Sequence, residues 1–182
     1  MDRQPVLEGD RLLLRPLHPD DWAALYAVAS DPLIWAVHPQ HDRWQERVFR
    51  AFFDKALAGG GAVVVIDRQS GAVIGSSRWE RYDPTERGSA EIGYTFLARS
   101  HWGGGCNREL KRLMLAHALA QVERVRFRVG EDNLRSRKAM EKIGGRLIEK
   151  ATVEDTASGP VRHVFFEIDR EDFAKGPLMS AA

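Results

Sequence analysis

Three consecutive glycines between a strand pattern and a helix pattern constrain this chain more than any other feature. Residues 91–97 predict a strand, residues 103–105 are the glycines, and a helix is expected to begin near Asn107 or Arg108. Glycines carry no Cβ atom and accept positive φ, so several backbone N–H groups can converge on one ligand. The free N–H groups and the positive dipole end of the helix point to the same place. The segment therefore predicts an anion-binding cradle, suited to a phosphate.

Two familiar phosphate-binding loops do not fit this segment. A nucleotide triphosphatase loop needs Gly-Lys followed by Ser or Thr, whereas Gly105 is followed by residues 106–108 (CNR). A dinucleotide fingerprint needs a third glycine where Arg108 stands, and it opens the first strand-helix unit of a parallel sheet. Here the glycines come late, after two strand patterns at 62–67 and 73–82 that resemble a hairpin.

The remaining interpretation is a resemblance to the pyrophosphate loop of the GNAT acyltransferases. That loop has Gln or Arg, two residues, Gly, one residue, and Gly or Ala. Trp102, Gly105 and Asn107 stand at its three defining positions, and only Gly105 matches strictly. The wider pattern, from 91–94 (EIGY) through Trp102 to Glu109, more closely resembles the RimJ/RimL-like branch of N-acetyltransferases.

A second block supports the same resemblance. Residues 133–136 (NLRS) resemble the Asn-x-x-Ser segment of that branch, and residues 141–145 (EKIGG) resemble its closing turn. The similarity extends over about 12–168. Two residues here depart from the family pattern, because Met140 stands where a tyrosine is usual and Gly145 where a phenylalanine often stands.

The resemblance implies one GNAT-type α/β (α+β) domain over residues 1–182, with a mixed, mostly antiparallel central sheet flanked by helices and two central strands that splay apart. Hydrophobic periodicity predicts elements that fit this fold. Trp44 and Phe52, in the second expected helix, are expected to pack in the core. Residues 174–182 are expected to form a mobile tail. Expected strands are 11–16, 62–67, 73–82, 91–97, 124–129, 146–153 and 162–168, and expected helices are 20–29, 42–58, 107–121 and 134–143.

Charge and cysteine content disfavour several classes of function. The 27 basic and 26 acidic residues give a formal net charge of +1, so no bulk charge favours nucleic acid or an acidic membrane. No stretch approaches the ~20 apolar residues of a membrane span, and the N-terminus has no apolar signal region. The single cysteine, Cys106, excludes an intramolecular disulfide and fits a reducing compartment. We therefore expect a cytoplasmic protein that binds neither nucleic acid nor membrane.

The resemblance implies acetyl-CoA as the acyl donor. The pyrophosphate of coenzyme A is expected on the cradle, and the pantetheine arm is expected to run along the preceding strand, with Phe96 and Leu97 as backbone partners. Asn133 is expected to hydrogen-bond the same arm, with a plain helix cap as the alternative. The other cofactor-binding residues expected are Trp102, Gly103, Gly104, Gly105, Cys106, Asn107, Arg108 and Ser136.

Acetyl transfer to an amine requires a neutral amine, a donor to the developing oxyanion and a proton for the leaving thiolate. A backbone N–H near Leu97 is expected to serve the oxyanion. The resembled branch places its serine at Ser136, so this hydroxyl is the expected proton donor, with a helix-start hydroxyl as the alternative. Glu91 is the candidate base, with a cross-strand ion pair to Arg78 or Arg128 as the alternative.

Several functional alternatives stay open at this level. The acceptor is expected to be a primary amine, on a small molecule or on a protein or peptide N-terminus. A non-catalytic acyl-CoA sensor or partner-binding module would also explain Met140 and Asn107. A nucleophilic Cys106 is disfavoured because no His or Asn partner is recognisable beside it. No metal is expected at His38 and His41, which lack further ligands at a convincing interval.

An arginine stripe alternates along one expected strand. Arg124, Arg126 and Arg128 share one face of that strand. We interpret the stripe as a solvated strand face, and the alternative is that the stripe contacts phosphate together with Arg135, Arg137 and Lys138. A homodimer is compatible with all of these features.

Overall fold

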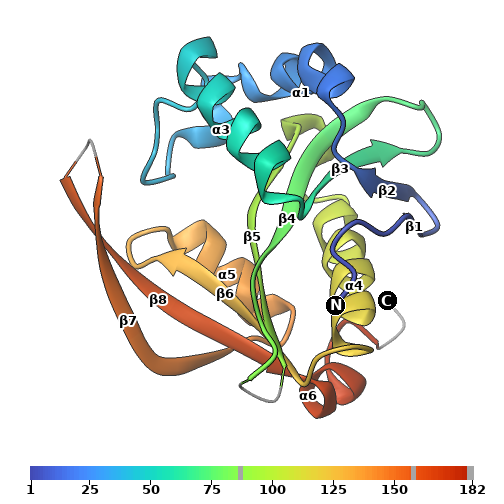
Figure 1. The fold of residues 1–182 in the computed structure, drawn as a ribbon, viewed down its shortest axis with the longest axis vertical. Coiled ribbons are helices and arrows are strands. Elements are labelled where there is room, and N and C mark those ends of the chain that lie inside the picture. Colours follow the sequence, from blue (N-terminus) through green and yellow to red (C-terminus); the bar gives the residue numbers. More distant parts are fainter. Residues whose placement is uncertain (86–87, 157–158, 180–182) are drawn as a thin grey trace.

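The computed structural model describes residues 1–85, 88–156 and 159–179 (Figure 1). In this part of the chain, the strands form one sheet in the order β1-β2-β3-β4-β5-β6-β8-β7, and all neighbouring pairs are antiparallel except β5 and β6. The expected mixed, mostly antiparallel sheet is therefore confirmed. The strands are β1 (Leu7–Glu8), β2 (Leu12–Pro16), β3 (Ala62–Asp67), β4 (Val73–Asp83), β5 (Ser89–Leu97), β6 (Arg124–Gly130), β7 (Arg146–Thr156) and β8 (Gly159–Asp169).

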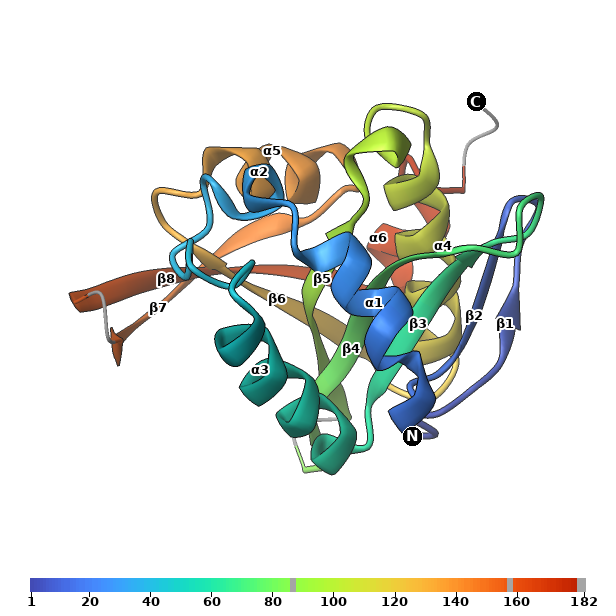
Figure 2. The same ribbon diagram turned by 90° about the horizontal axis from the view of Figure 1, so that it is seen from above.

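Helices cover both faces of this sheet. Figure 2 shows α1 and α3 on one face and α4 and α5 on the other. Two hydrophobic cores result, one between the sheet and each helical layer. The helices are α1 (Trp22–Ala29), α2 (Pro32–Trp35), α3 (Glu46–Gly59), α4 (Cys106–Leu119), α5 (Leu134–Lys142) and α6 (Arg170–Lys175), with 3-10 turns η1 (Pro19–Asp21) and η2 (Arg99–His101).

Strand β3 shows why both faces need cover. Val63 and Val65 belong to the core beneath α4, whereas Ala62 and Val64 belong to the core beneath α1 and α3. Side chains of a strand alternate between its two faces. A strand with apolar residues at successive positions must therefore be buried on both sides.

The two central strands are joined over only a short stretch. β5 and β6 pair in parallel from Ser89↔Arg124 to Glu91↔Arg126, and beyond this point they diverge (Figure 1). Further along β5, a bulge sets Tyr94 and Thr95 against the single residue Ser77 of β4. Tyr94 there has a φ of 54°, in the left-handed region that a bulky residue rarely adopts. The expected splay of the central strands is therefore present.

The second expected helix begins later than predicted, which changes its buried face. α3 begins after Asp42 and Trp44, so Trp44 precedes the helix and is 40% exposed. The prediction that Trp44 packs in the core is therefore wrong, because it assumed helical spacing before the helix had begun. Phe52 packs against the core but is only partly buried. The buried positions of α3 are Phe49, Phe53 and Ala56.

One other helix start differs from expectation, and one short helix was not predicted. The first expected helix ends at Ala29 as predicted. The unpredicted helix, α2, begins at Pro32, and Asp31 caps its first turn by accepting a hydrogen bond from the N–H of Leu33. α4 begins at Cys106 instead of Asn107 or Arg108, which is within a turn of the expected position.

The segment from Ala174 was expected to be a mobile tail, and its described part contacts the domain through Leu178 while Met179 is 55% exposed. Ala174 belongs to α6, and Leu178 is 3% exposed within the core beneath α4. Arg108 of α4 also donates a hydrogen bond to the carbonyl of Pro177. Residues 180–182 of this expected tail lie outside the described part of the chain.

Glu109 ties α4 to the start of β2. Its Oε1 accepts hydrogen bonds from the backbone N–H groups of Arg11 and Leu12, at 2.9 and 3.2 Å. A carboxylate that accepts two backbone N–H groups holds its position without any ligand. Glu109 therefore fixes the helix that carries the glycine loop against the neighbouring strand.

Replacing Glu109 with alanine removes this acceptor from two N–H groups. We expect the free energy of unfolding to fall by about 1–3 kcal/mol, as for other unsatisfied polar groups. Urea unfolding measures the effect, and Asp54→Ala, which removes an exposed carboxylate from α3, is the control. Equal stability of the two variants would contradict this structural role.

Candidate active site

The glycine loop leads directly into α4. Gly103 and Gly105 have φ values of 76° and 86°, so both lie where a residue with a Cβ atom is strained. The first backbone bond of the helix runs from the N–H of Glu109 to the carbonyl of Gly105, at 3.0 Å. The N–H groups of residues 106–108 therefore have no acceptor within the helix. These N–H groups lie at the position where the sequence predicts an anion cradle.

Arg11 brings a positive charge to this loop from a distant part of the chain. Its guanidinium donates a hydrogen bond to the carbonyl of Gly104. Its Nη1 also lies 3.8 Å from where a Cβ atom on Gly105 would stand. Sequence reasoning missed Arg11, because no local pattern connects it with the loop. A cation here supplements the helix dipole in attracting an anion.

Trp102 links the end of β5 to the helix after β6. Its Nε1 donates to the carbonyl of Leu97, at 2.9 Å. The guanidinium of Arg135 lies 4.6 Å from the indole centroid, and its Nη2 donates to the carbonyl of Ile34, at 2.8 Å. The indole N–H of Trp102 is thus directed at the strand end, while the residue is 41% exposed.

Phe96 and Leu97 direct their backbone groups to opposite edges of β5. The N–H of Ala98 donates to Ile74 of β4, and Phe96 pairs with Ser76 of β4. Hydrogen-bonding directions alternate along a strand, so Phe96 also faces β4 and Leu97 faces the diverging β6. The expectation that Phe96 offers backbone groups to a pantetheine arm is therefore wrong. Leu97 offers its N–H, since its carbonyl is taken by Trp102.

Asn133 and Ser136 lie at the start of α5, beyond the end of β6. Asn133 is 5% exposed, and its Oδ1 accepts from the backbone N–H of Ser136, at 3.1 Å. The amide oxygen thus caps the helix, which was the alternative role for Asn133. Ser136 is half-buried in the first turn, whereas Met140 is buried in the core.

Glu91 lies at the last registered pair of β5 and β6 and is 6% exposed. Its carboxylate oxygens lie 3.8 Å from Nε of Arg128 and 3.9 Å from Nε of Arg81. Burial raises the pKa of Glu91, and the charges of Arg128 and Arg81 only partly oppose this rise. Of the two partners expected for its ion pair, Arg128 is present, whereas Arg78 binds Glu80 at 3.2 Å.

A lysine lies buried under the bulge of β5. Lys111 of α4 is 3% exposed, and its Nζ donates to Oγ1 of Thr95, at 2.7 Å. Thr95 in turn lies 2.7 Å from Oγ of Ser77. Burial disfavours the charged amine and lowers the pKa of Lys111 to about 7. No pattern in the sequence distinguishes this lysine from exposed helical lysines elsewhere in the chain, such as Lys55 of α3 and Lys138 of α5.

The structure does not assemble the other candidates into a site. Cys106 is 1% exposed in the core beneath α4, which fits a packing role. The arginine stripe of β6 is paired with carboxylates, because Arg126 binds Glu167 at 3.1 Å and Arg128 binds Glu154 at 2.7 Å. Across the described residues, no three His, Cys, Asp or Glu side chains gather as metal ligands, and no helix there has the length and apolarity of a membrane span.

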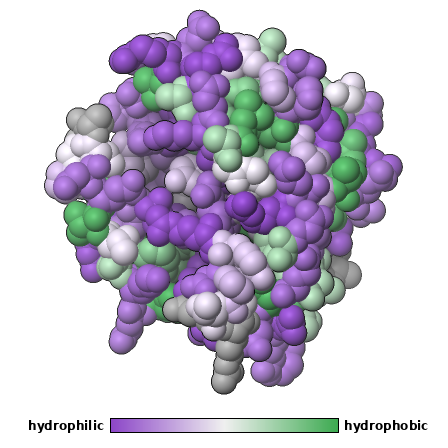
Figure 3. All heavy atoms as spheres, in the orientation of Figure 1, coloured by the Kyte–Doolittle hydropathy of each residue, from purple (hydrophilic) through white to green (hydrophobic). Residues whose placement is uncertain are grey.

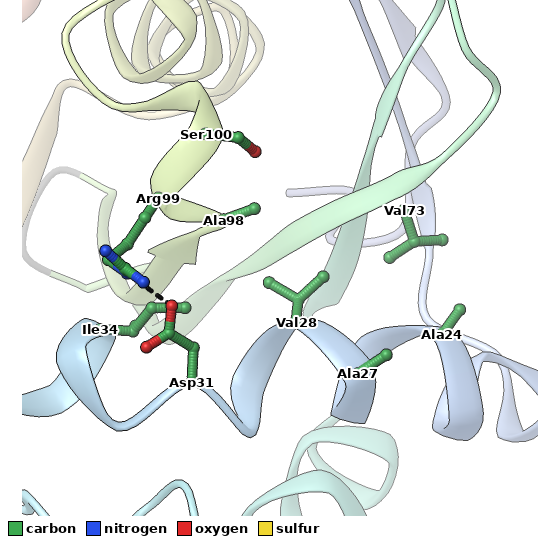
Figure 4. Close-up of a pocket in the computed structure, with 9 residues that line it drawn as sticks. All are labelled: Ala24, Ala27, Val28, Asp31, Ile34, Val73, Ala98, Arg99 and Ser100. Carbon is green, nitrogen blue, oxygen red and sulfur yellow. Dashed lines mark hydrogen bonds and ion pairs between the residues drawn. The ribbon is translucent and has the colours of Figure 1, made fainter.

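A separate surface cavity of about 630 Å³ lies between α1, α2 and the turn after β5 (Figure 4). Its lining is mixed, with apolar side chains from α1 and an ion pair between Asp31 and Arg99 at 2.5 Å. The hydrogen bond from Arg99 lowers the pKa of Asp31, so this carboxyl stays ionised. The cavity therefore offers an already satisfied ion pair to a ligand and no group suited to proton transfer.

The lowered pKa of Lys111 makes stability depend on pH. Between about pH 7 and pH 10 the unfolded chain binds a proton at this lysine that the folded chain does not, so stability rises with pH in this window. We expect Lys111→Met to remove part of that slope, by up to about 1.4 kcal/mol per pH unit. Urea unfolding at several pH values measures it, with Lys138→Met of exposed Lys138 as the control. If the unfolding free energies of wild type and Lys111→Met change in parallel with pH, the lowered pKa of Lys111 does not cause this pH dependence.

Comparison with known proteins agrees with this arrangement. A family model described as an acetyltransferase (GNAT) domain matches residues 11–146. Among solved structures, a GCN5-related N-acetyltransferase from Brucella melitensis is 21% identical with a TM-score of 0.82, and the match covers 93% of this chain and 80% of that one.

Two other structural relatives were solved with ligands. Mycobacterium smegmatis RimJ in complex with CoA-disulfide is 18% identical, with a TM-score of 0.72 and coverage of 96% of this chain and 92% of that one. Spermidine N-acetyltransferase from Vibrio cholerae, in complex with CoA and spermine, is 18% identical, with a TM-score of 0.70 and coverage of 92% and 100%. At these identities the structures show a shared fold, whereas the family model spans most of the sequence. The chain therefore belongs to the GNAT family of acetyltransferases, which take their acetyl group from acetyl-CoA.

Proposed function

We propose that this acetyltransferase moves the acetyl group of acetyl-CoA to a primary amine by direct attack, without an acyl-enzyme intermediate. The observation that carries the proposal is the opening between β5 and β6, which begins beyond Glu91. β5 leads to the glycine loop and β6 leads to Asn133. A donor with its pyrophosphate on the loop and its arm along the free edge of β5 has its thioester in this opening. The burial of Cys106 supports transfer without a cysteine intermediate.

The proposed roles follow the proton and charge transfers of the reaction. The amine nitrogen attacks the thioester carbonyl, and its proton passes to Glu91 directly or through a water. The N–H of Leu97 stabilises the negative charge on the carbonyl oxygen. When the C–S bond breaks, the thiolate receives a proton through the hydroxyl of Ser136, which regains one from solvent. The products are an acetamide and coenzyme A.

The environment of Glu91 supports its role as the base. A base works best when its pKa lies near the working pH, because it is then both ionised and able to hold a proton. Burial raises the pKa of Glu91 in that direction, and Arg128 and Arg81 keep the carboxylate form accessible. The same arginines fix the carboxylate beside the opening.

Two classes of acceptor are compatible with this proposal. The resembled RimJ/RimL-like branch acts on protein N-termini, whereas the Vibrio cholerae relative is a spermidine N-acetyltransferase. The competing function is a sensor that binds acyl-CoA without turnover. We also propose a cytoplasmic location, which the single cysteine supports because disulfide-free chains suit a reducing compartment.

Cofactor binding is the first test of the proposal. Isothermal titration is expected to show micromolar binding of acetyl-CoA and coenzyme A and none of ATP at the same concentration. Thiol release with a panel of amines and peptides then separates an enzyme from a sensor. In the Ser136→Ala variant we expect unchanged affinity and turnover reduced by about 100-fold, typical of a lost proton donor. Absence of acetyl-CoA binding would overturn the proposed function.

Substitution of Glu91 by glutamine tests the base. We expect kcat to fall by about 100-fold or more near pH 7, because the amine then loses its proton acceptor. The deficit should shrink as the pH approaches the pKa of the acceptor amine, since a neutral amine needs less help. Steady-state rates from pH 6 to about 10 measure this convergence. A constant ratio of wild-type to variant rates across the range would assign Glu91 a structural role.

A further inference from the structure

Two arginines lie buried beside the opening, from different parts of the chain. Arg43 precedes α3 and is 3% exposed, and Arg78 of β4 is 6% exposed. Each guanidinium carbon lies 4.5 Å from the ring centroid of Phe52. Arginines are seldom buried unless a carboxylate or another anion compensates their charge.

The described residues compensate these charges only in part. Arg78 Nη1 binds Oε1 of Glu80 at 3.2 Å, but its buried Nη2 donates no hydrogen bond to any described residue. Arg43 donates to the neutral amide oxygen of Gln40 and, within the described ranges, makes no ion pair. The cluster of Arg43, Arg78 and Glu80 therefore carries a net positive charge in a place that is largely shielded from water.

The negative charge nearest to Arg43 in sequence is that of Asp42, which partly opposes the lowering of the Arg43 pKa but forms no ion pair with Arg43 among the described residues. Glu91, a buried carboxylate nearby, is held by Arg81 and Arg128. The surrounding protein lowers the pKa of His38 to about 3, and the charge of Arg43 adds to this effect, so His38 is neutral. Burial, together with Arg78, also lowers the pKa of Arg43 to about 10, which still leaves it charged near pH 7.

The arginine cluster borders the place where the acceptor must arrive. Arg78 also lies over the ring of Tyr94, 4.2 Å from its centroid, and Tyr94 forms the bulge where β5 leaves β6. Arg128, the partner of Glu91, lies 3.4 Å from the Tyr94 hydroxyl. On the face seen in Figure 3, hydrophilic side chains surround a hollow between the α3 layer and the strands of the opening.

We propose that the acceptor amine carries an oxyanion, a carboxylate or a phosphate, which binds to Arg78 and Arg43. This inference rests on the proposed acetyl transfer to an amine and specifies its substrate class. Stacking on Phe52 and Tyr94 holds the planar guanidinium groups, and a held guanidinium presents its donors to an oxyanion in a fixed fork. The amine of such a small molecule then faces Glu91, whereas a polycationic amine is repelled.

Matched pairs of acceptors test the proposal. β-Alanine is compared with β-alaninamide, and phosphoethanolamine with ethanolamine, at saturating acetyl-CoA, with spermidine as a cationic amine. We expect kcat/KM for one anionic member to exceed that of its neutral partner by about 30-fold or more, equivalent to about 2 kcal/mol, as for a buried ion pair. The pair with the larger ratio identifies carboxylate or phosphate as the anion. A ratio of anionic to neutral kcat/KM near one in both pairs, or a preference for spermidine, would overturn the inference.

Variants of Arg78 and Arg43 test whether the arginine cluster causes the preference for anionic acceptors. In Arg78→Gln we expect the ratio between anionic and neutral acceptors to collapse through KM, while the KM for acetyl-CoA is unchanged. Arg78→Lys should recover only part of the ratio, because lysine keeps the charge but lacks the planar fork. Arg43→Gln gives a second test if Arg78→Gln unfolds. Arg47→Gln, which removes an exposed arginine of α3, is the control. A ratio that survives in both Arg78→Gln and Arg43→Gln refutes the assignment.

Failure of the proposed acetyl transfer can be distinguished from failure of the proposed anion site. The protein can bind acetyl-CoA and still release no thiol with any amine. In that case, binding of β-alanine and of phosphoethanolamine is measured by titration in the presence of coenzyme A. This titration tests the anion site without any need for turnover. Tighter binding of the anionic probe than of its neutral partner, lost in Arg78→Gln, would support the anion site without acetyl transfer. No difference between the members of either pair would refute it.

Discussion

The parting of β5 from β6 is the constraint on which the whole site depends. Two strands that stay paired hydrogen-bond to each other, so their facing backbone N–H and C=O groups cannot bind a ligand. Because the pairing ends at Glu91↔Arg126, the Leu97 edge of β5 is turned to the opening and not to a neighbouring strand. The bulge at Tyr94 interrupts the pairing of β5 with β4 three residues beyond Glu91. α4 and α5 each follow one of the two diverging strands, so both helices begin where the strands lead apart.

The parts of this arrangement that are local in sequence could be predicted. The glycine loop, the helix after it and the Asn133 block all carry their signals within a few residues, and the strand patterns follow from alternation. Phe96 shows where such reasoning stops, because the edge to which a backbone group points depends on the register with β4. Trp44 shows the same limit for a helix, where one misplaced start assigned the wrong residue to the core.

Residues that meet only through tertiary contacts carried no signal in the sequence. Arg11 reaches the glycine loop because Glu109 holds the start of β2 against α4. Arg43 and Arg78 come together on Phe52 from a loop and a strand. Each of these side chains resembles an ordinary surface arginine in composition and pattern. Only the fold shows that these arginines are buried or placed beside a backbone cradle.

Charged groups under the opening share one physical property, which is that burial works against their charge. Glu91, Lys111 and Arg43 each have a pKa displaced in the direction that favours the neutral form. Such displacements lower the stability of the folded state and are typical of places where a protein uses charge for chemistry or recognition.

The strand order β6-β8-β7 has a consequence for how the chain assembles. β8 lies between β6 and β7 and pairs with both, although it is made after them. During synthesis, β7 therefore leaves the ribosome before β8, the strand with which it pairs. This half of the sheet can form only after β8 has left the ribosome, so an incomplete chain exposes the edge of β6 to other molecules.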